Sequence, residues 1–315
     1  MSIKSVLGLV LKVLLLTIVM FVVLSVGANF FTADSALAQQ MTPEEAAASG
    51  MLLLVVSFID TLILTYFILR SRLHGPRLMI AVGLVYYGVK TFLSIIEAWW
   101  FMSDVTPGEL PGLFLMTVPV AVIFPVIAVF VLGKARRKET TDDQINTRLV
   151  MPAGQLSWKI AVLAVIVYPV LFWTFGYFVA FSNPELVAYY GATHPGSFFA
   201  QMGNVWADDP LVFLFEIFRG ALWVALALPV IRTTKGRIWE AGLLVALLFS
   251  LVQNDMHLLP GIMPPSVRLS HFIETASSNL IFAMILTWLL HREHSSVRDL
   301  FKSQSRPAHS EKALS

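Results

Sequence analysis

The sequence predicts an all-α protein, a polytopic transmembrane helix bundle of about eight spans. Three observations predict this class. Hydrophobic residues make up 57% of the 315 residues and charged residues only 13%, against roughly 25% charged in a soluble domain. The apolar residues are concentrated in runs near the roughly 20 residues that cross a bilayer. Finally, Lys and Arg collect in alternate loops, as they do in multi-pass membrane proteins.

Eight apolar segments are candidate spans. They cover residues 6–28, 51–69, 78–101, 113–133, 158–181, 210–231, 238–258 and 268–290. The longest pieces between or beyond them contain about 20 to 28 residues, and below about 40 residues a chain rarely folds unaided. We therefore expect residues 1–315 to form a single transmembrane domain that ends in a basic tail, 291–315.

The first span has two interpretations. Its charged start and apolar run, followed by SALAQQ with an A-x-A pattern at Ala36 to Ala38, resemble a secretory signal peptide. However, the apolar run continues to Phe31, which is longer than a usual signal region. We favour a retained helix, which gives eight spans with both ends inside. Cleavage would leave seven spans.

The loop charges predict the orientation. Three loops and the tail are basic; they hold Arg70, Arg72 and Arg77, then Lys134, Arg136, Arg137, Lys138 and Arg148, then Arg232, Lys235 and Arg237, and finally Arg292, Arg298, Lys302, Arg306 and Lys312. Loops 28–49, 102–112, 182–209 and 259–267 contain no Lys or Arg. Because basic loops stay in the cytoplasm, the C-terminus is predicted to be cytoplasmic. Loop 134–157 separates two groups of four spans, a possible duplication.

Polar residues interrupt the spans toward their outer ends. The candidates for a polar cavity are Asp60, Lys90, Glu97, Glu216, Arg219, Gln253, Asn254, Arg268, His271, Glu274 and Asn279. On the third, seventh and eighth spans they recur at helical spacing and so form stripes. A charge at the bilayer centre costs roughly 3 kcal/mol even on the lenient insertion scale. The stripes are therefore predicted to face a shared outward-facing cavity in the bundle.

This cavity predicts binding or transport of a small polar or ionic solute, or of a lipid head group. Arg219 and Arg268 would hold an anionic group, and Glu97, Glu216 and Glu274 would balance charge or carry protons. Loop 182–209 is rich in aromatic residues and Gly and could cover the cavity. The alternative of interhelical clamps remains open, because polar side chains also join membrane helices. The net charge of +2 does not suggest a nucleic-acid partner.

A metal-dependent membrane hydrolase is a second possibility, so the chain's status as an enzyme stays open. His257, His271, Glu216 and Glu274 are ligand types that zinc accepts, although no HExxH motif and no Cys are present. No metal site or cofactor is therefore assigned. A third possibility is an accessory or assembly protein, whose basic tail could lie on anionic lipid.

Two resemblances add to these expectations. Residues 215–220, FEIFRG, resemble the E-E-x-x-x-R-G motif of the CAAX-type intramembrane proteases, an eight-helix family with Glu and His in the active site. This chain departs from the pattern at Phe215, which replaces the first Glu, at Gln253, which replaces a His, and at Thr275. VYYGVKTFLSIIEAWWF, FRGALWVALALPVIR and VRLSHFIETASSNLIF resemble an uncharacterised group of bacterial multi-pass membrane proteins. This resemblance implies the bacterial plasma (inner) membrane.

Overall fold

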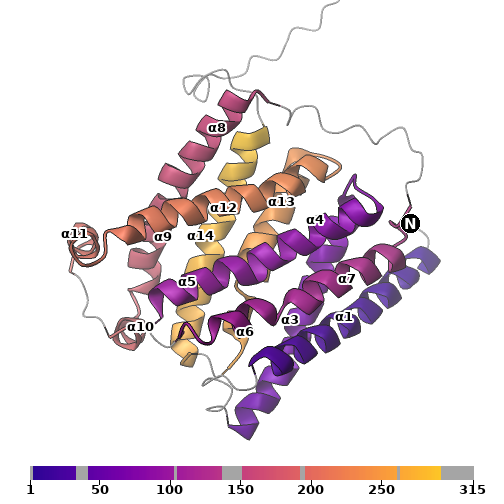
Figure 1. Ribbon diagram of the computed structural model, residues 1–315, viewed down its shortest axis with the longest axis horizontal. Helices are drawn as coiled ribbons and strands as arrows, with labels where there is room; N and C mark the ends of the chain where they lie inside the picture. Colours follow the sequence, from indigo (N-terminus) through magenta and orange to yellow (C-terminus); the bar gives the residue numbers. More distant parts are fainter. Residues whose placement is uncertain are drawn as a thin grey trace, which may run out of the picture.

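The computed structural model describes residues 3–32, 42–102, 105–136, 151–191, 196–260 and 263–291. These residues fold into a bundle of helices (Figure 1). The helices are α1 (Ile3–Thr32), α3 (Pro43–Arg70), α4 (Gly75–Tyr87), α5 (Leu93–Phe101), α6 (Leu110–Leu115), α7 (Val118–Val131), α8 (Ala153–Val162), α9 (Tyr168–Phe175), α10 (Pro184–Tyr189), α11 (Phe198–Asp208), α12 (Leu211–Thr233), α13 (Ile238–Leu247) and α14 (Pro265–His291). The predicted all-α class is confirmed.

Short π-helical and 3-10 segments lie between some of these helices. They are η1 (Gly88–Phe92), η3 (Leu163–Val167), η4 (Gly176–Ala180), η5 (Leu248–Val252) and η6 (Asp255–Leu258). π-helical turns inside α-helices are rare and are frequent at functional sites. Two of these segments carry or precede predicted site residues, since Lys90 belongs to η1 and Gln253 follows η5.

Seven helices within the described residues are long and apolar enough to cross a membrane. They are Lys4–Thr32, Pro43–Arg70, Gly75–Phe101, Leu110–Val131, Ala153–Ala180, Leu211–Thr233 and Pro265–His291. The remaining predicted span, 238–258, is a shorter apolar helix, Ile238–Val252. At 1.5 Å per residue its length is about 22 Å, whereas the hydrocarbon core is about 30 Å thick. The helix is therefore too short to cross the whole hydrocarbon core, and the polar residues that follow Val252 lie beyond its end.

The first helix is an integral part of the bundle. Leu16 and Met20 of α1 are fully buried, and α1 contacts both α3 and α7. That the helix is retained rather than cleaved stays a prediction. The A-x-A pattern and the basic tail beyond His291 lie outside the described residues.

The spans form two layers that cross at an angle (Figure 1). In one layer α1 contacts α7, α7 contacts α4, and α4 contacts α12. In the other layer α3 contacts α13, α13 contacts α14, and α14 contacts α9. With the spans numbered along the chain, the two orders are 1-4-3-6 and 5-8-7-2. Replacing each span of the first half by its equivalent in the second half (1 by 5, 2 by 6, 3 by 7 and 4 by 8), and the reverse, turns the first order into the second. The two halves are therefore related by an approximate two-fold axis.

A short backbone pairing marks this axis. Ser71 and Thr234 form an isolated antiparallel bridge, and the hydrogen bonds from Arg72 N to Thr233 O and from Lys235 N to Arg70 O flank it symmetrically, each at 2.7 Å. In the register of this bridge Asp60 corresponds to Trp223, Tyr86 to Phe249, and Lys90 to Gln253.

The corresponding side chains make corresponding contacts. The hydroxyl group of Tyr86 donates to Asp60 at 3.0 Å, and the rings of Phe249 and Trp223 pack with their centroids 4.3 Å apart. The possible duplication noted in the sequence therefore has a counterpart in the helix arrangement, although the contact is a hydrogen bond in the first half and a ring contact in the second.

The basic loops meet at one end of the bundle. There Arg70 forms an ion pair with Glu240, and the Lys134 ammonium donates to the Ser71 carbonyl at 2.7 Å. At the opposite end Ser49 donates to the Pro260 carbonyl at 3.3 Å. We call these the basic end and the acidic end. The predicted alternation of loops corresponds to two real ends of the molecule.

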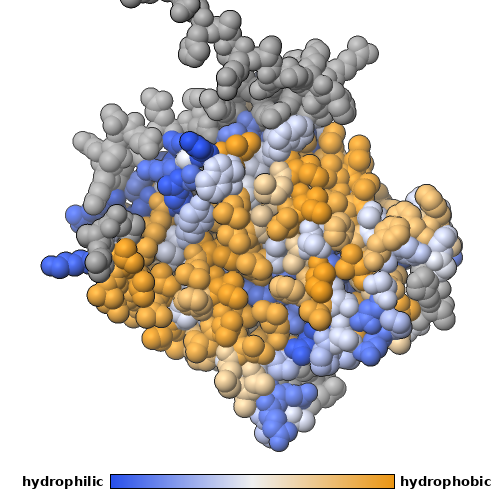
Figure 2. Space-filling view, turned by 180° about the vertical axis from the view of Figure 1, so that it is seen from behind, coloured by the Kyte–Doolittle hydropathy of each residue, from blue (hydrophilic) through white to orange (hydrophobic). Residues whose placement is uncertain are grey.

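The outer surface of the bundle is apolar. Figure 2 shows hydrophobic side chains over much of one face, with hydrophilic side chains gathered toward its margins. Exposed residues such as Ile80, Val122, Val170 and Leu214 belong to the spans. This surface suits a lipid bilayer, because lipid tails can cover apolar side chains without hydrogen bonding.

Glycines let helices approach closely inside each half. A Cβ atom added to Gly83 of α4 would collide with the Ala121 carbonyl of α7, and one added to Gly220 of α12 would lie 2.9 Å from Ala164 Cα. Small residues at such contacts are typical of membrane helix pairs, whose association depends on close packing.

Replacing Gly83 by alanine is expected to lower the free energy of unfolding by about 1 to 3 kcal/mol, the usual cost of overpacking. The measurement is thermal unfolding of detergent-purified protein. Gly50→Ala is the matched control, since nothing lies within 4 Å of a Cβ there and Ala is the better helix former. Equal melting temperatures for the two variants would contradict the proposed close contact.

Candidate functional site

A small cavity lies among α5, α9, α12 and α14. The residues that line it are Glu97, Tyr168, Leu171, Phe172, Arg219, Gln253, Glu274, Thr275, Ser278, Asn279 and Phe282. Its volume is about 20 Å³, on the order of what one water molecule needs. The structure therefore brings together polar groups from these four helices and from the turn after η5 around a space that suits a small guest.

Arg219 is the central cation of this cavity. Its guanidinium forms an ion pair with Glu97 and donates to both carboxylate oxygens of Glu216 at 2.9 and 3.0 Å. The spacing of three residues along α12 places Glu216 and Arg219 on one face of the helix. Arg219 is 2% exposed and Glu216 is fully buried. The pair is therefore shielded from lipid by protein.

Aromatic rings complete the surroundings of Arg219. The guanidinium carbon lies 5.8 Å from the ring centre of Tyr168 and 5.6 Å from those of Phe172 and Phe215. Cations are attracted to the faces of such rings. Tyr168 and Phe172 were not predicted as site residues, because in the sequence they belong to an ordinary apolar span.

The cavity contains more negative than positive groups. Glu97 and Glu274 line the cavity, and Glu216 lies beside it as a partner of Arg219, so that three carboxyl groups face one guanidinium. Glu274 does not bind Arg219; it accepts a hydrogen bond from the ring of His271 instead. An additional positive charge in the cavity would therefore be attracted by the uncompensated carboxylate charge.

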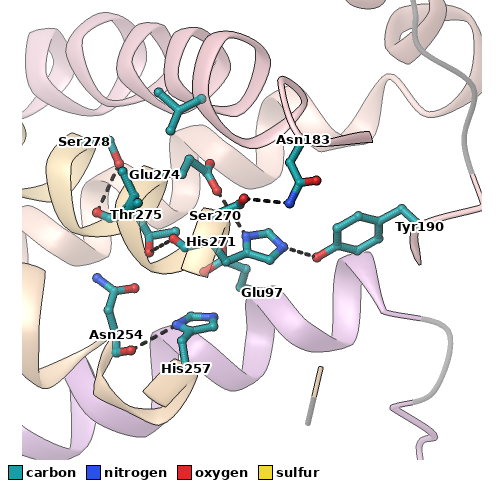
Figure 3. A network of polar contacts seen from close by, with 12 residues as sticks. Glu97, Asn183, Tyr190, Asn254, His257, Ser270, His271, Glu274, Thr275 and Ser278 are labelled. Carbon is teal, nitrogen blue, oxygen red and sulfur yellow. Dashed lines mark hydrogen bonds and ion pairs between the residues drawn. The ribbon is translucent and has the colours of Figure 1, made fainter. Parts of the chain in front are cut away.

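A chain of hydrogen bonds leads from the acidic end to the cavity. The Tyr190 hydroxyl lies 2.7 Å from His271 Nε2, and His271 Nδ1 lies 3.1 Å from Glu274 Oε2 (Figure 3). Burial raises the pKa of the Tyr190 phenol, and the charges of Glu274 and Glu97 raise it further. The phenol therefore remains protonated and donates to Nε2, so that Nδ1–H donates to Glu274.

The helix α10 positions Tyr190 over the cavity. Asn183, at the start of α10, donates to Ser270 Oγ of α14 at 2.9 Å (Figure 3). Leu186 packs with Val267 and Ala180 in a small apolar cluster. Part of the loop 182–209 thus covers the end of α14 that carries His271, where the sequence predicted a covering segment.

Replacing Tyr190 by phenylalanine is expected to lower the free energy of unfolding by about 1 kcal/mol at neutral pH, the value of one hydrogen bond. The raised pKa adds a pH dependence. Above the usual phenol pKa of about 10 the unfolded chain ionises while the folded chain does not, so the wild type loses its advantage as pH rises. Chemical unfolding of both proteins between pH 8 and roughly 11 checks this; a constant difference would contradict it.

Two amides connect the cavity to the seventh span. Asn279 Nδ2 donates to Gln253 Oε1 at 3.3 Å and to the Phe249 carbonyl at 3.2 Å. Gln253 Nε2 in turn donates to Ser94 Oγ at 3.4 Å. The structure thus places Gln253 and Asn279 together at the cavity wall, along with Glu97, Arg219 and Glu274.

Asp60 and Lys90 belong to a second cluster. The Lys90 ammonium binds Asp60 Oδ2 at 3.1 Å and also forms an ion pair with Asp255. The Tyr86 hydroxyl donates to the same Asp60 oxygen. All of these side chains are buried. Neither Asp60 nor Lys90 lines the cavity, so the predicted set of residues divides into two neighbouring clusters.

Asp255 is the functional candidate that the sequence did not indicate. The α-helical spacing of the seventh span puts Ser250, Gln253 and Asn254 on one face and leaves Asp255 off it. In the structure the helix ends at Val252, and Asp255 begins the 3-10 segment η6. This change of geometry turns the carboxyl group toward Lys90. The run of polar residues that begins soon after Leu251 was the feature of the sequence that could have indicated the end of the helix.

Three predicted residues have other partners. Arg268 donates to the Leu258 carbonyl at 3.1 Å, and Asn254 Nδ2 donates to the Ser250 carbonyl at 3.1 Å. The ring of His257 stacks on His271 with centroids 5.8 Å apart, and its Nδ1 lies 3.1 Å from the Asn254 carbonyl (Figure 3). They surround the cavity rather than line it.

The expected metal ligands do not converge. Within the described part of the chain no group of three or more His, Cys, Asp or Glu side chains has the arrangement that could hold a metal ion. Glu216 is held by Arg219, and His271 is held between Tyr190 and Glu274.

Comparison with known proteins gives no further assignment. No family model matches the chain, and neither a curated protein nor a solved structure is significantly similar to it. The fold and site therefore define a class only, a multi-pass helical membrane protein with a buried polar site.

Proposed function

We propose that this membrane protein binds a small, positively charged solute in the cavity among α5, α9, α12 and α14. One observation carries the proposal: the carboxyl groups of Glu97 and Glu274 line the cavity, the buried carboxyl group of Glu216 lies beside it, and a single arginine opposes the three. Burial in a low-dielectric bundle makes the remaining negative charge costly unless a cation or protons neutralise it. A bound cation would supply that charge.

The charges favour a cation over an anion. An anionic ligand would need a free guanidinium in the cavity, but two carboxylates already bind Arg219, and Arg268 does not line the cavity. Among the described residues, by contrast, the carboxyl group of Glu274 has only the ring of His271 as its hydrogen-bond partner. Its carboxyl group, together with the amides of Gln253 and Asn279, offers oxygen acceptors to an ammonium group.

The size of the cavity restricts the guest. A volume of about 20 Å³ accepts a group the size of water, and an ammonium group is of that size. Such a group could belong to a free amine or to the head group of a lipid. We further propose that the protein lies in a bacterial plasma membrane and that its acidic end faces away from the cytoplasm, because the loops at that end lack Lys and Arg.

Thermal unfolding of nanodisc-embedded protein with added ammonium or methylammonium chloride tests the proposal. Both salts are expected to raise the melting temperature of the wild type, since a ligand that binds only the folded state stabilises it. Glu274→Gln is expected to abolish the shift. Glu240→Gln, which removes a carboxyl group at the basic end, should keep it.

Choline acetate at equal ionic strength is the control, because choline is larger than the cavity, and it is expected to produce no shift. Native mass spectrometry of the same preparation distinguishes the sources of the ammonium group, since a retained aminolipid would add its mass to the wild type and not to Glu274→Gln. Equal shifts of the melting temperature in the wild type and Glu274→Gln would contradict the proposal.

Transport is a second candidate function, favoured by the repeated arrangement of spans. Parallel repeats related by an axis along the membrane normal, with interrupted helices near the midplane, recur in transporters. Here the two interrupted segments η1 and η5 contact each other. Uptake of radiolabelled methylammonium by proteoliposomes tests transport, and binding without uptake would restrict the function to binding.

A hydrolase receives less support from the geometry. In the motif FEIFRG the carboxylate of Glu216 is engaged by Arg219 and is fully buried. Its lone pairs are thus committed to a structural ion pair rather than to an attacking water.

A further inference from the structure

The second polar cluster is unbalanced in charge. Asp60 of α3 and Asp255 of η6 share the single ammonium group of Lys90. Their exposed fractions are 0% and 1%, and that of Lys90 is 3%. Two carboxylates and one ammonium leave one negative charge in the interior of the bundle, where an uncompensated charge costs several kcal/mol. The cluster is neutral only if it gains one more positive charge.

Two carboxylate oxygens are free to receive that charge. Asp60 Oδ1 and Asp255 Oδ2 are buried and have no hydrogen-bond partner, whereas Asp60 Oδ2 accepts from both Tyr86 and Lys90. A buried acceptor without a donor is rare in proteins. Both carboxyl groups bind the same ammonium group of Lys90, which places them close to each other.

We propose that the Asp60–Lys90–Asp255 cluster is a binding site for one monovalent positive charge, a proton held by the two carboxyl groups. A proton needs only one or two oxygens, as in carboxyl pairs that share one proton because like charges cannot both ionise at close range. A sodium ion is the other possible source of the charge. It prefers more oxygen ligands than the two free carboxylate oxygens provide.

The neighbours of the cluster leave it no other charge partner among the described residues. Tyr86 faces it from α4, Lys90 from η1 and Asp255 from η6, while Met20 of α1 contributes a thioether sulfur near the Tyr86 hydroxyl. Within the described part of the chain, Lys90 forms ion pairs with Asp60 and Asp255. These ion pairs involve none of the glutamates around the cavity.

The cluster is close to the cavity along the chain, and it has no charged counterpart in the repeat. Asp255 follows Gln253 by two residues across the break after η5, and Gln253 lines the cavity. In the repeat Gln253 occupies the position that corresponds to Lys90. The first half thus has the ammonium group of Lys90 where the second half has the neutral amide of Gln253. The charged cluster therefore exists in the first half of the repeat and has no counterpart at the corresponding position of the second.

Infrared difference spectroscopy tests the proposal on the full chain in nanodiscs. A protonated carboxylic acid has a carbonyl band of its own, separate from those of carboxylates. Because this cluster contains only Asp and the cavity only Glu, labelling aspartate with ¹³C at the side-chain carboxyl identifies the band without any substitution. Within the described segments Asp60 and Asp255 are the buried aspartates.

For the wild type we expect a ¹³C-shifted acid band equal to one aspartic acid per chain at neutral pH. Asp255→Asn and Asp60→Asn should each lose the whole band, because the remaining carboxylate then pairs with Lys90 alone and stays ionised. These two variants retain a neutral ion pair and should fold. Glu240→Gln should leave the band unchanged.

A second measurement covers the other source of the charge. If sodium fills the site, the band is absent, and sodium chloride raises the wild-type melting temperature relative to choline chloride while Asp255→Asn shows no such effect. Either result supports a site for one positive charge and identifies its occupant. The absence of both the aspartic acid band and the sodium effect in the wild type would overturn the proposal. Loss of ammonium binding in Glu274→Gln leaves this outcome unaffected, so the two sites are tested separately.

Discussion

Replacing Arg219 by methionine is expected to lower the free energy of unfolding by about 3 to 5 kcal/mol, the usual cost of removing one partner of a buried ion pair. The loss would leave Glu97 and the fully buried Glu216 without the guanidinium that binds both. Purified yield and thermal unfolding in detergent measure the effect. Arg232→Met is the control on the same helix, since Arg232 is exposed near the basic end.

A compensating variant separates charge from packing. In Arg219→Met/Glu97→Gln/Glu216→Gln no buried charge remains unpaired at this position, and neutral replacements of buried ion pairs are often harmless to stability. We expect most of the lost stability to return. If the triple variant were as unstable as Arg219→Met alone, the energetic role assigned to the ion pairs would be wrong.

Lys90→Met is expected to have the second largest effect, again about 3 to 5 kcal/mol. Without the ammonium group, Asp60 and Asp255 would both need a proton or remain as adjacent buried negative charges. Thermal unfolding is again the measurement. Lys12→Met removes an exposed lysine of α1 and should change the melting temperature little.

The rescue for this site is Lys90→Met/Asp60→Asn/Asp255→Asn. It removes every charge of the cluster, and we expect it to recover most of the stability that Lys90→Met loses. A wild-type-like melting temperature of Lys90→Met itself would show that the ammonium group does not neutralise the two carboxylates.

The spans and the alternation of basic loops could be predicted from the sequence because both depend on local composition. Apolar runs of the length of a bilayer and clusters of Lys and Arg need no knowledge of neighbours. Helix periodicity also indicated which faces are buried, so that Glu97, Glu216, Arg219, Glu274 and Asn279 could be named as one set.

The rest depends on which helices are neighbours. The order of spans within the two layers separates Asp60 and Lys90 from the cavity, and estimates of depth could not separate them. Asp255 escaped notice because a helical wheel assumes a continuous helix, whereas the helix ends at Val252. Tyr190 lies in a loop without periodicity, and its contact with His271 is tertiary.

Cysteine accessibility tests most directly whether the polar face of α14 borders a cation-attracting cavity at the acidic end. The chain contains no Cys, so Thr275→Cys provides a single thiol at the cavity wall. Leu280→Cys provides a lipid-facing control on the same helix. In vesicles of known orientation, a cationic methanethiosulfonate should modify Thr275→Cys from the acidic end faster than an anionic one does, and ammonium chloride should slow it. Equal rates for the two reagents, or reaction from the basic end only, would contradict the account.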